Sequence, residues 1–512
     1  MSQTKDGGFQ LSVIGAGTMG SGIALAALYA GWRVRLYDVS QEMLDQAESY
    51  LEKYLERKSN KQARQNLSLH ESMGDLREAD IWIEAAPEKL SLKQDIFQSM
   101  ESVAGSGAVL ATNTSTLSIA AIASATKTPE RVIGMHFFNP AAVMPLVEVV
   151  APEGVEDAVV ERAKQAALAL GKTPVVVSDT PGFIVNRVAR PYYSEGLQLL
   201  TEGIAAVEQI DRLAEGIGFP MGPFKLMDFI GNDVNFAATQ SVFEQTFMES
   251  RYRPHVLQQR MVQAGKLGRK TGEGFYKYPL EQAEVQPEEF PPSFRGSVHL
   301  EVDGIAPGIE DLLARSNLEI ADSISSAQLA ILALRHSADM YRRLESLERE
   351  LPAEAPVLCQ AITTSRSKLC QMAEHPERII GFDSMFFEVG EVASLVVGQE
   401  TSAMAKQSVS SFVRTLEKRI VWIKDAPAMV LPRLVAMLVN EAAFAVQEGI
   451  ASPEDIDRAM ELGVRYPQGP LAWGRSLGFD TVLHVLVDLR SRQGDPRYRP
   501  ALALRRWANG DG

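Results

Sequence analysis

The stretch LSVIGAGTMG, residues 11–20, decides the fold of the first part of this 512-residue chain, together with the run RVRLYD at residues 33–38. The first four residues predict a short buried strand, and an apolar helix follows the glycines. Gly15 permits the tight turn, Gly17 lets the backbone approach a pyrophosphate, and Gly20 lets the helix pack closely on a sheet. Strand, glycines, helix and second strand occur in the order that a dinucleotide site requires.

The same region also predicts which dinucleotide is bound. Thr18 and Met19 begin the helix, so we expect its N-terminus to face the phosphates. Asp38 ends the second strand, where a carboxylate accepts hydrogen bonds from ribose hydroxyls. Because that carboxylate repels a 2′-phosphate, the expected cofactor is NAD and not NADP.

Apolar strands and amphipathic helices alternate as far as about residue 178. The runs 79–85 and 109–113 are expected to be buried strands on either side of one helix. This alternation is typical of an α/β domain with a doubly wound parallel sheet. From Thr180 to about Ala264 helical periods replace the strands, which predicts an all-helical domain packed on the first one, with the substrate in the cleft between them.

A catalytic pair is predicted in the stretch GMHFFNP at residues 134–140 and the run LVEVV at residues 146–150. Asn139-Pro140 separates two strand-like runs, which we expect to lie side by side and antiparallel. Glu148 can then reach one ring nitrogen of His136 and leave the other for a substrate proton. A carboxylate-oriented imidazole is a general base near neutral pH, and a core histidine beside an unrelated acid is the alternative interpretation.

These motifs resemble the L-3-hydroxyacyl-CoA dehydrogenases of fatty-acid β-oxidation. Further motifs extend the resemblance to about residue 280 in unbroken order: NTS at 113–115, DTPGFIVNR at 179–187, FPMGPF at 219–224 and GRKTGEGFY at 268–276. The resemblance implies a Rossmann-like NAD-binding domain followed by a helical domain. It also implies that an acyl-CoA is the substrate and that its 3-hydroxyl group is oxidised.

The resemblance assigns two residues to the substrate. Ser115 and Asn186 match positions that hydrogen-bond the reacting oxygen and help to place the substrate beside His136. Ser115 follows a strand end, where doubly wound sheets bind their ligands, and an ordinary turn serine is the alternative. Asn186 begins an apolar helix, where an amide needs a hydrogen-bond partner.

Three further residues are implied for the cofactor and one for coenzyme A. Glu88 and Lys93 match residues near the nicotinamide ribose, and a surface pair of the two is the alternative. Asn113, at the end of a strand, is also assigned to the cofactor. Lys61 lies in a local basic run and is the nearest match to a residue that contacts the phosphates of coenzyme A. A solvated helix face is the alternative for that run.

A narrower resemblance concerns the acyl group. The segment VARPYYSE at residues 188–195 and the tandem architecture are most similar to the bacterial 3-hydroxyadipyl-CoA dehydrogenases of phenylacetate degradation. This implies a short or dicarboxylic acyl chain. Arg187 and Arg190 can meet a terminal carboxylate, and solvent or a domain interface is the alternative environment for both.

Two other functions compete with this interpretation. The first is an NAD-dependent dehydrogenase of a free hydroxy acid, as in relatives that act on gulonate or carnitine. The second is a nucleotide-sensing or structural protein in which the dehydrogenase site is a relic. The presence of His136, Glu148, Ser115 and Asn186 together argues against a relic.

Composition restricts the class of protein further. The formal net charge of −14 argues against nonspecific nucleic-acid binding. No apolar run reaches membrane-spanning length, so we expect no membrane association. Cys359 and Cys370 give neither a disulfide framework nor zinc spacing, so we expect no metal site and a reducing, cytoplasmic setting.

A linker rich in proline and glutamate divides the chain into two related halves. Motifs of the first half recur in order about 246 residues later: DTPG at 179–182 returns as DAPA at 425–428, and PERVIG at 129–134 as PERIIG at 376–381. The predicted order is an NAD-binding domain (1–178), a helical substrate and dimerisation-type domain (179–280), the linker (281–294), a degenerate Rossmann-like domain (295–424) and a second helical domain (425–512).

The second half is expected to be structural, without a working site. His136 corresponds to Asp383 and Asn186 to Pro432, and no GxGxxG motif follows the linker. The apolar helical periods nevertheless survive, so the helices of 425–512 are expected to pack on those of 180–265 about a pseudo-twofold axis, as an internal imitation of a dimer. The sequence leaves open whether whole chains also form a homodimer.

Overall fold

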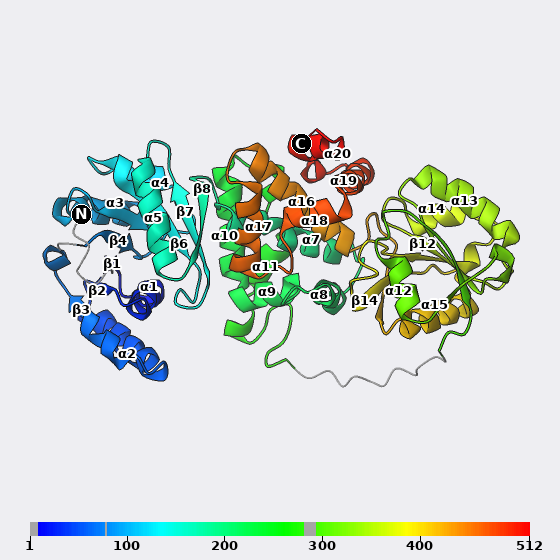
Figure 1. The fold of residues 1–512 in the computed structure, drawn as a ribbon, viewed down its shortest axis with the longest axis horizontal. Helices are drawn as coiled ribbons and strands as arrows, with labels where there is room; N and C mark the ends of the chain where they lie inside the picture. Colours follow the sequence, from blue (N-terminus) through cyan, green and yellow to red (C-terminus); the bar gives the residue numbers. More distant parts are fainter. Residues whose placement is uncertain (1–8, 77–78, 281–292, 512) are drawn as a thin grey trace. The chain divides into compact units, whose positions relative to one another are not determined.

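The structure is a computed structural model that describes residues 9–76, 79–280 and 293–511 (Figure 1). All but the last two residues of the predicted linker lie outside the described ranges. The chain forms two compact units, and neither is a continuous stretch of sequence. The first unit consists of Met1–Arg187 and Glu448–Arg465, and the second of Val188–Gln447 and Tyr466–Gly512.

An eight-stranded sheet forms the framework of the first unit, in the order β3-β2-β1-β4-β5-β6-β7-β8. All neighbouring strands are parallel except β6 and β7, which are antiparallel. Apolar side chains of α1, α2 and α5 pack on the sheet to form its core. The elements are β1 Gln10–Ile14, α1 Thr18–Tyr29, β2 Arg33–Tyr37, α2 Gln41–Arg57, β3 Leu67–His70, β4 Ile81–Glu84, α3 Leu90–Val103, β5 Val109–Thr112, α4 Ile119–Ala123, β6 Val132–Phe137, β7 Leu146–Ala151, α5 Asp157–Ala169, β8 Thr173–Ser178 and α6 Val185–Val188.

A seven-stranded sheet in the second unit repeats this architecture, in the order β10-β9-β11-β12-β13-β14-β15. Again one neighbouring pair, β13 and β14, is antiparallel. Helices α13 and α14 lie on one side of this sheet, and α12 and α15 on the other (Figure 1). The elements are β9 Ser297–Val302, α12 Ile309–Arg315, β10 Glu319–Ile320, β11 Leu329–Ala333, α13 Ser337–Glu350, β12 Val357–Gln360, α14 Arg366–Met372, β13 Ile379–Phe382, β14 Val392–Val396, α15 Ala403–Thr415 and β15 Arg419–Ile423.

A helical set follows each sheet in the chain, so the predicted fold class is confirmed: an α/β domain and a helical domain, both repeated. Among the described residues, no helix combines the length and hydrophobicity that a membrane crossing requires. The first set comprises α7 Arg190–Thr201, α8 Val207–Gly216, α9 Pro223–Ile230, α10 Asn232–Gln245 and α11 Val256–Gln263, and the second comprises α16 Leu431–Gln447, α17 Pro453–Val464, α18 Pro470–Leu477, α19 Phe479–Gln493 and α20 Leu502–Ala508.

One helix of each set packs on the sheet from the other half of the chain. In the first unit, α17 contacts β7 and β8, and a Cβ on its Gly463 would lie 2.8 Å from the Leu146 side chain. In the second unit, α8 contacts β14, and the carbonyl of Gly216 accepts from the backbone N–H of Glu391 at 3.0 Å. Sequence periodicity did not predict this exchange, because it does not reveal which sheet a helix covers.

Buried ion pairs join the two helical sets inside the second unit, where α7 packs on α16. Glu441 accepts from Arg251 at 2.7 Å and from Tyr252 at 2.5 Å. Its counterpart 246 residues earlier, Glu195, accepts from the Tyr498 hydroxyl at 3.1 Å and pairs with Arg497 at 3.6 Å. Because each set donates to the other through equivalent residues, the contact has the reciprocity of a twofold interface.

Candidate active site

The glycine loop after β1 has the shape that a dinucleotide needs. Gly15 has a φ of 106°, and a Cβ there would lie 2.9 Å from the carbonyl oxygen of Ala85. A Cβ on Gly20 would lie 1.8 Å from the carbonyl oxygen of Gly15, so no other residue fits at either position. In contrast, a Cβ on Gly17 would meet nothing within 4 Å. The loop is therefore closed towards the sheet and open at the start of α1, where Thr18 is exposed and a pyrophosphate fits.

Asp38 directly follows β2 and is fixed by the backbone. Its Oδ2 accepts from the N–H of Ala16 at 2.8 Å, and its Oδ1 accepts from the N–H of Ser40 at 3.0 Å. Each carboxylate oxygen has a second lone pair, so both can still accept from ribose hydroxyls. The half-buried carboxylate thus holds the glycine loop and presents negative charge beside it, and the residues present fit NAD.

His136 and Glu148 lie directly opposite each other on the antiparallel strands β6 and β7. His136 Nδ1 lies 2.6 Å from Glu148 Oε2, and only 6% of His136 and 0% of Glu148 are exposed. No described residue is hydrogen-bonded to Nε2, the other ring nitrogen. Two aromatic rings flank the imidazole, Phe138 with a centroid distance of 4.6 Å and Phe183 at 5.8 Å. The imidazole is therefore oriented on one side and available to a ligand on the other.

The second oxygen of Glu148 is held by backbone from the segment that follows β8. Oε1 accepts from the N–H groups of Ile184 and Val185, both at 3.0 Å. Phe183 just before them has a φ of 50°, a left-handed conformation that is uncommon for a bulky residue. This turn aims both N–H groups at the carboxylate and brings the start of α6, which carries Asn186, to the His136–Glu148 pair.

Hydrogen bonds hold the loop after β5 near the His136–Glu148 pair. The side-chain carbonyl of Asn113 accepts from the N–H of Phe137 at 2.8 Å, next to His136 in β6. Ser118 donates to Asp179 at 2.9 Å, which ties this loop to the segment leading to Asn186. The Ser115 hydroxyl and the half-buried Asn186 amide form no side-chain hydrogen bond with any described residue, so both are free for a ligand.

Glu88 shapes the loop that carries Ser115. Its Oε1 accepts from the N–H groups of Ser115 and Thr116 at 3.1 Å each, and it also binds the Thr114 hydroxyl. Burial raises the pKa of Glu88, but the hydrogen bond from Thr114 and the charge of Lys93 outweigh it, so the net pKa is lowered. Glu88 is thus held as a carboxylate beside this loop.

Lys93 is not part of a surface pair, because it is 1% exposed. Its ammonium group donates to Glu84 at 2.7 Å and to the carbonyl of Ala86 at 3.2 Å, and it lies 3.4 Å from Glu88. Three acceptors match its three protons, so Lys93 has none left for a cofactor and supports Glu88 instead. The sequence interpretation missed Glu84, a carboxylate at the end of a buried strand that also accepts from Thr112 at 2.6 Å.

Lys61 is an exposed surface residue near the end of α2. Its Nζ lies 2.8 Å from Glu56 Oε1, and 73% of its side chain is exposed. Arg64 likewise pairs with Glu48 and Glu52. The basic run is therefore interleaved with acids, and Lys61 has a counter-ion already, although exposed pairs of this kind are weak.

The second sheet has lost the equivalent site. Asp383 follows β13 at the position of His136, and Ser394 lies opposite it in β14 at the position of Glu148. Side chains also fill the space beside the glycines after β9: a Cβ on Gly304 would lie 2.8 Å from the Arg335 guanidinium, and one on Gly308 would lie 2.8 Å from the Glu388 side chain. In the described residues of this sheet domain, no imidazole lies at the position of His136, and side chains occupy the space of the phosphate cradle.

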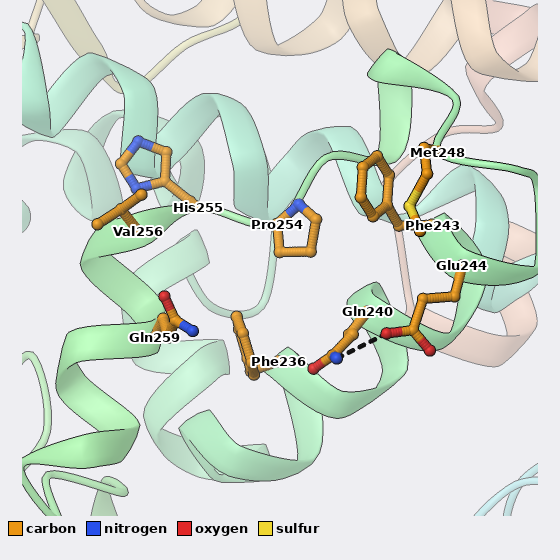
Figure 2. Close-up of a pocket in the computed structure, with 9 residues that line it drawn as sticks. All are labelled: Phe236, Gln240, Phe243, Glu244, Met248, Pro254, His255, Val256 and Gln259. Atoms are coloured by element: carbon orange, nitrogen blue, oxygen red, sulfur yellow. Dashed lines mark hydrogen bonds between the residues drawn. The ribbon is translucent and has the colours of Figure 1, made fainter.

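A separate pocket of about 220 Å³ lies in the second unit between α10 and α11. Figure 2 shows Phe236, Phe243 and Pro254 around it, with a hydrogen bond from Gln240 to Glu244 on one side. None of the residues predicted for the cofactor or the substrate lines this pocket.

Two domains of one protein family match the chain. The 3-hydroxyacyl-CoA dehydrogenase NAD binding domain matches residues 10–180. The C-terminal domain of the 3-hydroxyacyl-CoA dehydrogenases matches residues 182–278 and 429–511, that is, both helical sets.

Individual relatives agree with these matches. The chain is 38% identical to a 3-hydroxyadipyl-CoA dehydrogenase of Escherichia coli K12, with 97% of both chains covered. It is 40% identical to a probable 3-hydroxybutyryl-CoA dehydrogenase of Bacillus subtilis 168, covering 52% of this chain and 97% of that one. A crystal structure of a 3-hydroxybutyryl-CoA dehydrogenase from E. coli K12 matches with a TM-score of 0.79, 35% identity and 98% of both chains covered.

Proposed function

Since the chain belongs to the 3-hydroxyacyl-CoA dehydrogenase family, whose members are NAD-dependent oxidoreductases, we propose that His136 is its catalytic base and that a short dicarboxylic 3-hydroxyacyl-CoA is its substrate. One observation carries the first part of the proposal. His136 Nδ1 is 2.6 Å from a fully buried carboxylate, while Nε2 has no hydrogen-bond partner among the described residues.

The roles of the pair follow from this geometry. Glu148 accepts a hydrogen bond from the Nδ1–H of His136, so the lone pair of the neutral imidazole is on Nε2. There it takes the proton of the substrate 3-hydroxyl. The imidazolium that forms is stabilised by the charge of Glu148. Ser115 and Asn186, whose side chains are free, hydrogen-bond the substrate oxygen and orient it towards Nε2.

NAD supplies the acceptor for the hydrogen on C3, together with its electron pair. The glycine loop (Gly15, Gly17, Thr18, Met19 and Gly20) would hold its pyrophosphate, and Asp38 the adenosine ribose hydroxyls. Glu88 and Asn113 would lie on the nicotinamide side, with Lys93 in a supporting role. Lys61 would exchange Glu56 for a phosphate of coenzyme A.

The acyl group is the less constrained part of the proposal. The relative that aligns with nearly the whole chain is named for 3-hydroxyadipyl-CoA, whereas the matching E. coli crystal structure is titled for 3-hydroxybutyryl-CoA. We favour the dicarboxylic ester, because the VARPYYSE segment places an arginine four residues after Asn186.

The experiment is the rate of NADH formation from a panel of 3-hydroxy substrates. The panel contains the adipyl, butyryl and long-chain CoA esters and the corresponding free acids. We expect the highest kcat/KM with the adipyl ester. A higher kcat/KM with a long unbranched ester would overturn the substrate assignment, and activity with free acids alone would move the chain to the hydroxy-acid dehydrogenases.

We propose one catalytic site per chain and a structural second half. The ion pairs of Glu441 with Arg251 and of Glu195 with Arg497 have the reciprocity of a subunit interface, so the second helical set takes the place of a partner subunit. A homodimer of whole chains then needs a different surface.

A further inference from the structure

A buried carboxylate, Glu84, occupies the last position of β4, and no step of the proposed reaction uses it. Its side chain is 0% exposed. Strand β4 lies between β1, which leads into the glycine loop, and β5, which leads into the loop that carries Ser115. Open α/β sheets bind their ligands at the carboxyl ends of the strands. Glu84 therefore lies at the ligand-binding edge of the first sheet, between the strands of the cofactor loop and the substrate loop.

The two side-chain oxygens of Glu84 bind groups from three segments of the chain. Oε2 accepts from the Thr112 hydroxyl at 2.6 Å. Oε1 accepts from the backbone N–H of Ala86 at 2.6 Å and from the Lys93 ammonium at 2.7 Å. In addition, the main-chain carbonyl of Glu84 accepts from the N–H of Asn113 at 2.8 Å. Glu84 thus joins the ends of β4 and β5 to the first turn of α3.

One series of contacts leads from Glu84 through Thr112 to the substrate loop. Because the Thr112 hydroxyl donates its proton to Glu84, its oxygen is oriented to accept from the opposite side. It accepts there from the backbone N–H of Thr114 at 3.2 Å. Thr114 directly precedes Ser115, so Glu84 orients the backbone on which the Ser115 hydroxyl is carried.

A second series of contacts runs through Lys93 and Glu88. The Lys93 ammonium lies between two carboxylates, 2.7 Å from Glu84 and 3.4 Å from Glu88. Glu88 in turn accepts from the backbone N–H of Ser115 at 3.1 Å. One buried cation therefore serves two acids, and the second of them binds the backbone of Ser115 itself.

The second sheet shows that the same architecture forms without this pair. Strand β11 lies between β9 and β12, as β4 lies between β1 and β5. Ala333 ends β11 in the register in which Glu84 ends β4. Met340 takes the place of Lys93, because each is the fourth residue after the N-cap of its helix, α13 or α3. The charged pair is thus present in the sheet that keeps a site and replaced by apolar residues in the sheet that has lost it.

Stability alone does not account for the pair. The desolvation of two buried charges offsets much of their attraction, so well-packed apolar side chains often stabilise a core as well or better. Ala333 and Met340 are both 0% exposed in the second sheet. What they cannot provide is an acceptor for a hydroxyl such as that of Thr112 or a cation for a carboxylate such as Glu88.

We propose that Glu84 and Lys93 are positioning residues for the dehydrogenase reaction. They hold the loop after β5 in the geometry in which the Ser115 hydroxyl binds the substrate oxygen, and neither of them touches the substrate. This inference rests on the proposed function, which assigns Ser115 to the substrate.

The test gives the first sheet the residues of the second, in the double variant Glu84→Ala/Lys93→Met of the full chain. The measured quantities are the Kd for NADH, and kcat and KM with 3-hydroxybutyryl-CoA and 3-hydroxyadipyl-CoA. The kcat is expressed per molecule of NADH bound, so that unfolded protein does not count. We expect kcat to fall on the order of 10²-fold with both esters, the effect of a misplaced reacting group. The Kd for NADH should stay within a few-fold of the wild type, because the glycine loop and Asp38 hold the cofactor.

Thr112 provides a finer test with a conservative rescue. Thr112→Val keeps the shape of the side chain and removes the hydroxyl, so kcat should fall by about 10-fold, the loss of one hydrogen bond to a charged group. Thr112→Ser keeps the hydroxyl, and its kcat should stay within a few-fold of the wild type. If the double variant does not fold, this comparison decides, and equal kcat values for the two Thr112 variants would overturn the inference.

The matched control removes a buried ion pair from the second sheet domain. Arg378 lies 3.5 Å from Glu348, and their side chains are 3% and 0% exposed. Glu348→Ala/Arg378→Met should leave kcat per bound NADH unchanged, and thermal unfolding verifies that each variant folds. A lowered Tm with a nearly normal kcat for Glu84→Ala/Lys93→Met would make that pair purely structural and overturn the inference alone. If the wild type oxidised neither ester, the proposed function itself would be wrong, and this inference would fall with it.

Discussion

The backbone N–H of Ser178, at the end of β8, donates to the carbonyl oxygen of Ile450 at 2.9 Å. The equivalent bond 246 residues along the chain runs from Lys424 to Ile204, also at 2.9 Å. Each bond joins the end of a sheet's last strand to the loop before the exchanged helix, α17 in the first unit and α8 in the second. The two subunits of a twofold-symmetric dimer make such equivalent contacts with each other. In this protein the two halves of one chain make them.

The buried ion pairs between the helical sets should contribute strongly to stability. Arg433 lies 2.8 Å from Glu195 and 2.7 Å from Glu202, and neither Arg433 nor Glu195 is exposed. Arg433→Met removes the cation nearest to the buried carboxylate of Glu195, so we expect the free energy of unfolding to fall by about 3–5 kcal/mol. Arg349→Met, which removes an exposed pair with Glu345, should change it by about 0–1 kcal/mol. Urea unfolding measures the change in unfolding free energy for both variants. A loss for Arg433→Met as small as that for Arg349→Met would refute the predicted contribution of the Arg433–Glu195 pair.

One molecule of NADH should bind per chain. The space beside Gly304 and Gly308 is filled by the side chains of Arg335 and Glu388, and Asp383 replaces the histidine. Isothermal titration of the full-length protein with NADH measures the stoichiometry directly. A value of two equivalent sites would show that the second sheet still binds nucleotide.

Cofactor choice should depend on Asp38. The wild type is expected to prefer NADH to NADPH in kcat/KM, because the anchored carboxylate repels a 2′-phosphate. Asp38→Asn keeps a side-chain oxygen for the N–H of Ala16 and removes the charge. The ratio of kcat/KM with NADH to kcat/KM with NADPH should therefore fall. Steady-state kinetics with both cofactors tests the idea, and equal efficiency of NADPH in the wild type would contradict it.

Glu148→Gln should impair turnover through the tautomer of His136. The amide oxygen must accept from Ile184 and Val185, so its NH₂ group faces Nδ1. The imidazole then carries its proton on Nε2 and cannot take one from the substrate. We expect kcat to fall by about 10²–10⁴, the range for loss of a general base. Glu153→Gln, an exposed carboxylate five residues away, is the control. A kcat for Glu148→Gln within a few-fold of the wild type would contradict this role.

The sequence was sufficient where function depends on local patterns. The glycine loop, Asp38 and the antiparallel pairing of His136 with Glu148 all follow from residues near one another in the chain. The Asn139-Pro140 break also placed the strand reversal correctly.

Contacts between distant segments could not be predicted in the same way. Lys93 was interpreted as a surface residue in one alternative because the pattern of a single helix does not show that Glu84 lies beneath it. The exchange of α8 and α17 depends on which of two similar sheets offers the complementary surface.

The most direct test of the account is His136→Gln, assayed for turnover and for NADH binding in the same preparation. Glutamine cannot act as a general base but is polar and of similar size. We expect kcat to fall by about 10²–10⁴ while the Kd for NADH stays within a few-fold of the wild type, because the glycine loop and Asp38 hold the cofactor. A nearly normal kcat would contradict the assignment of His136 as the base.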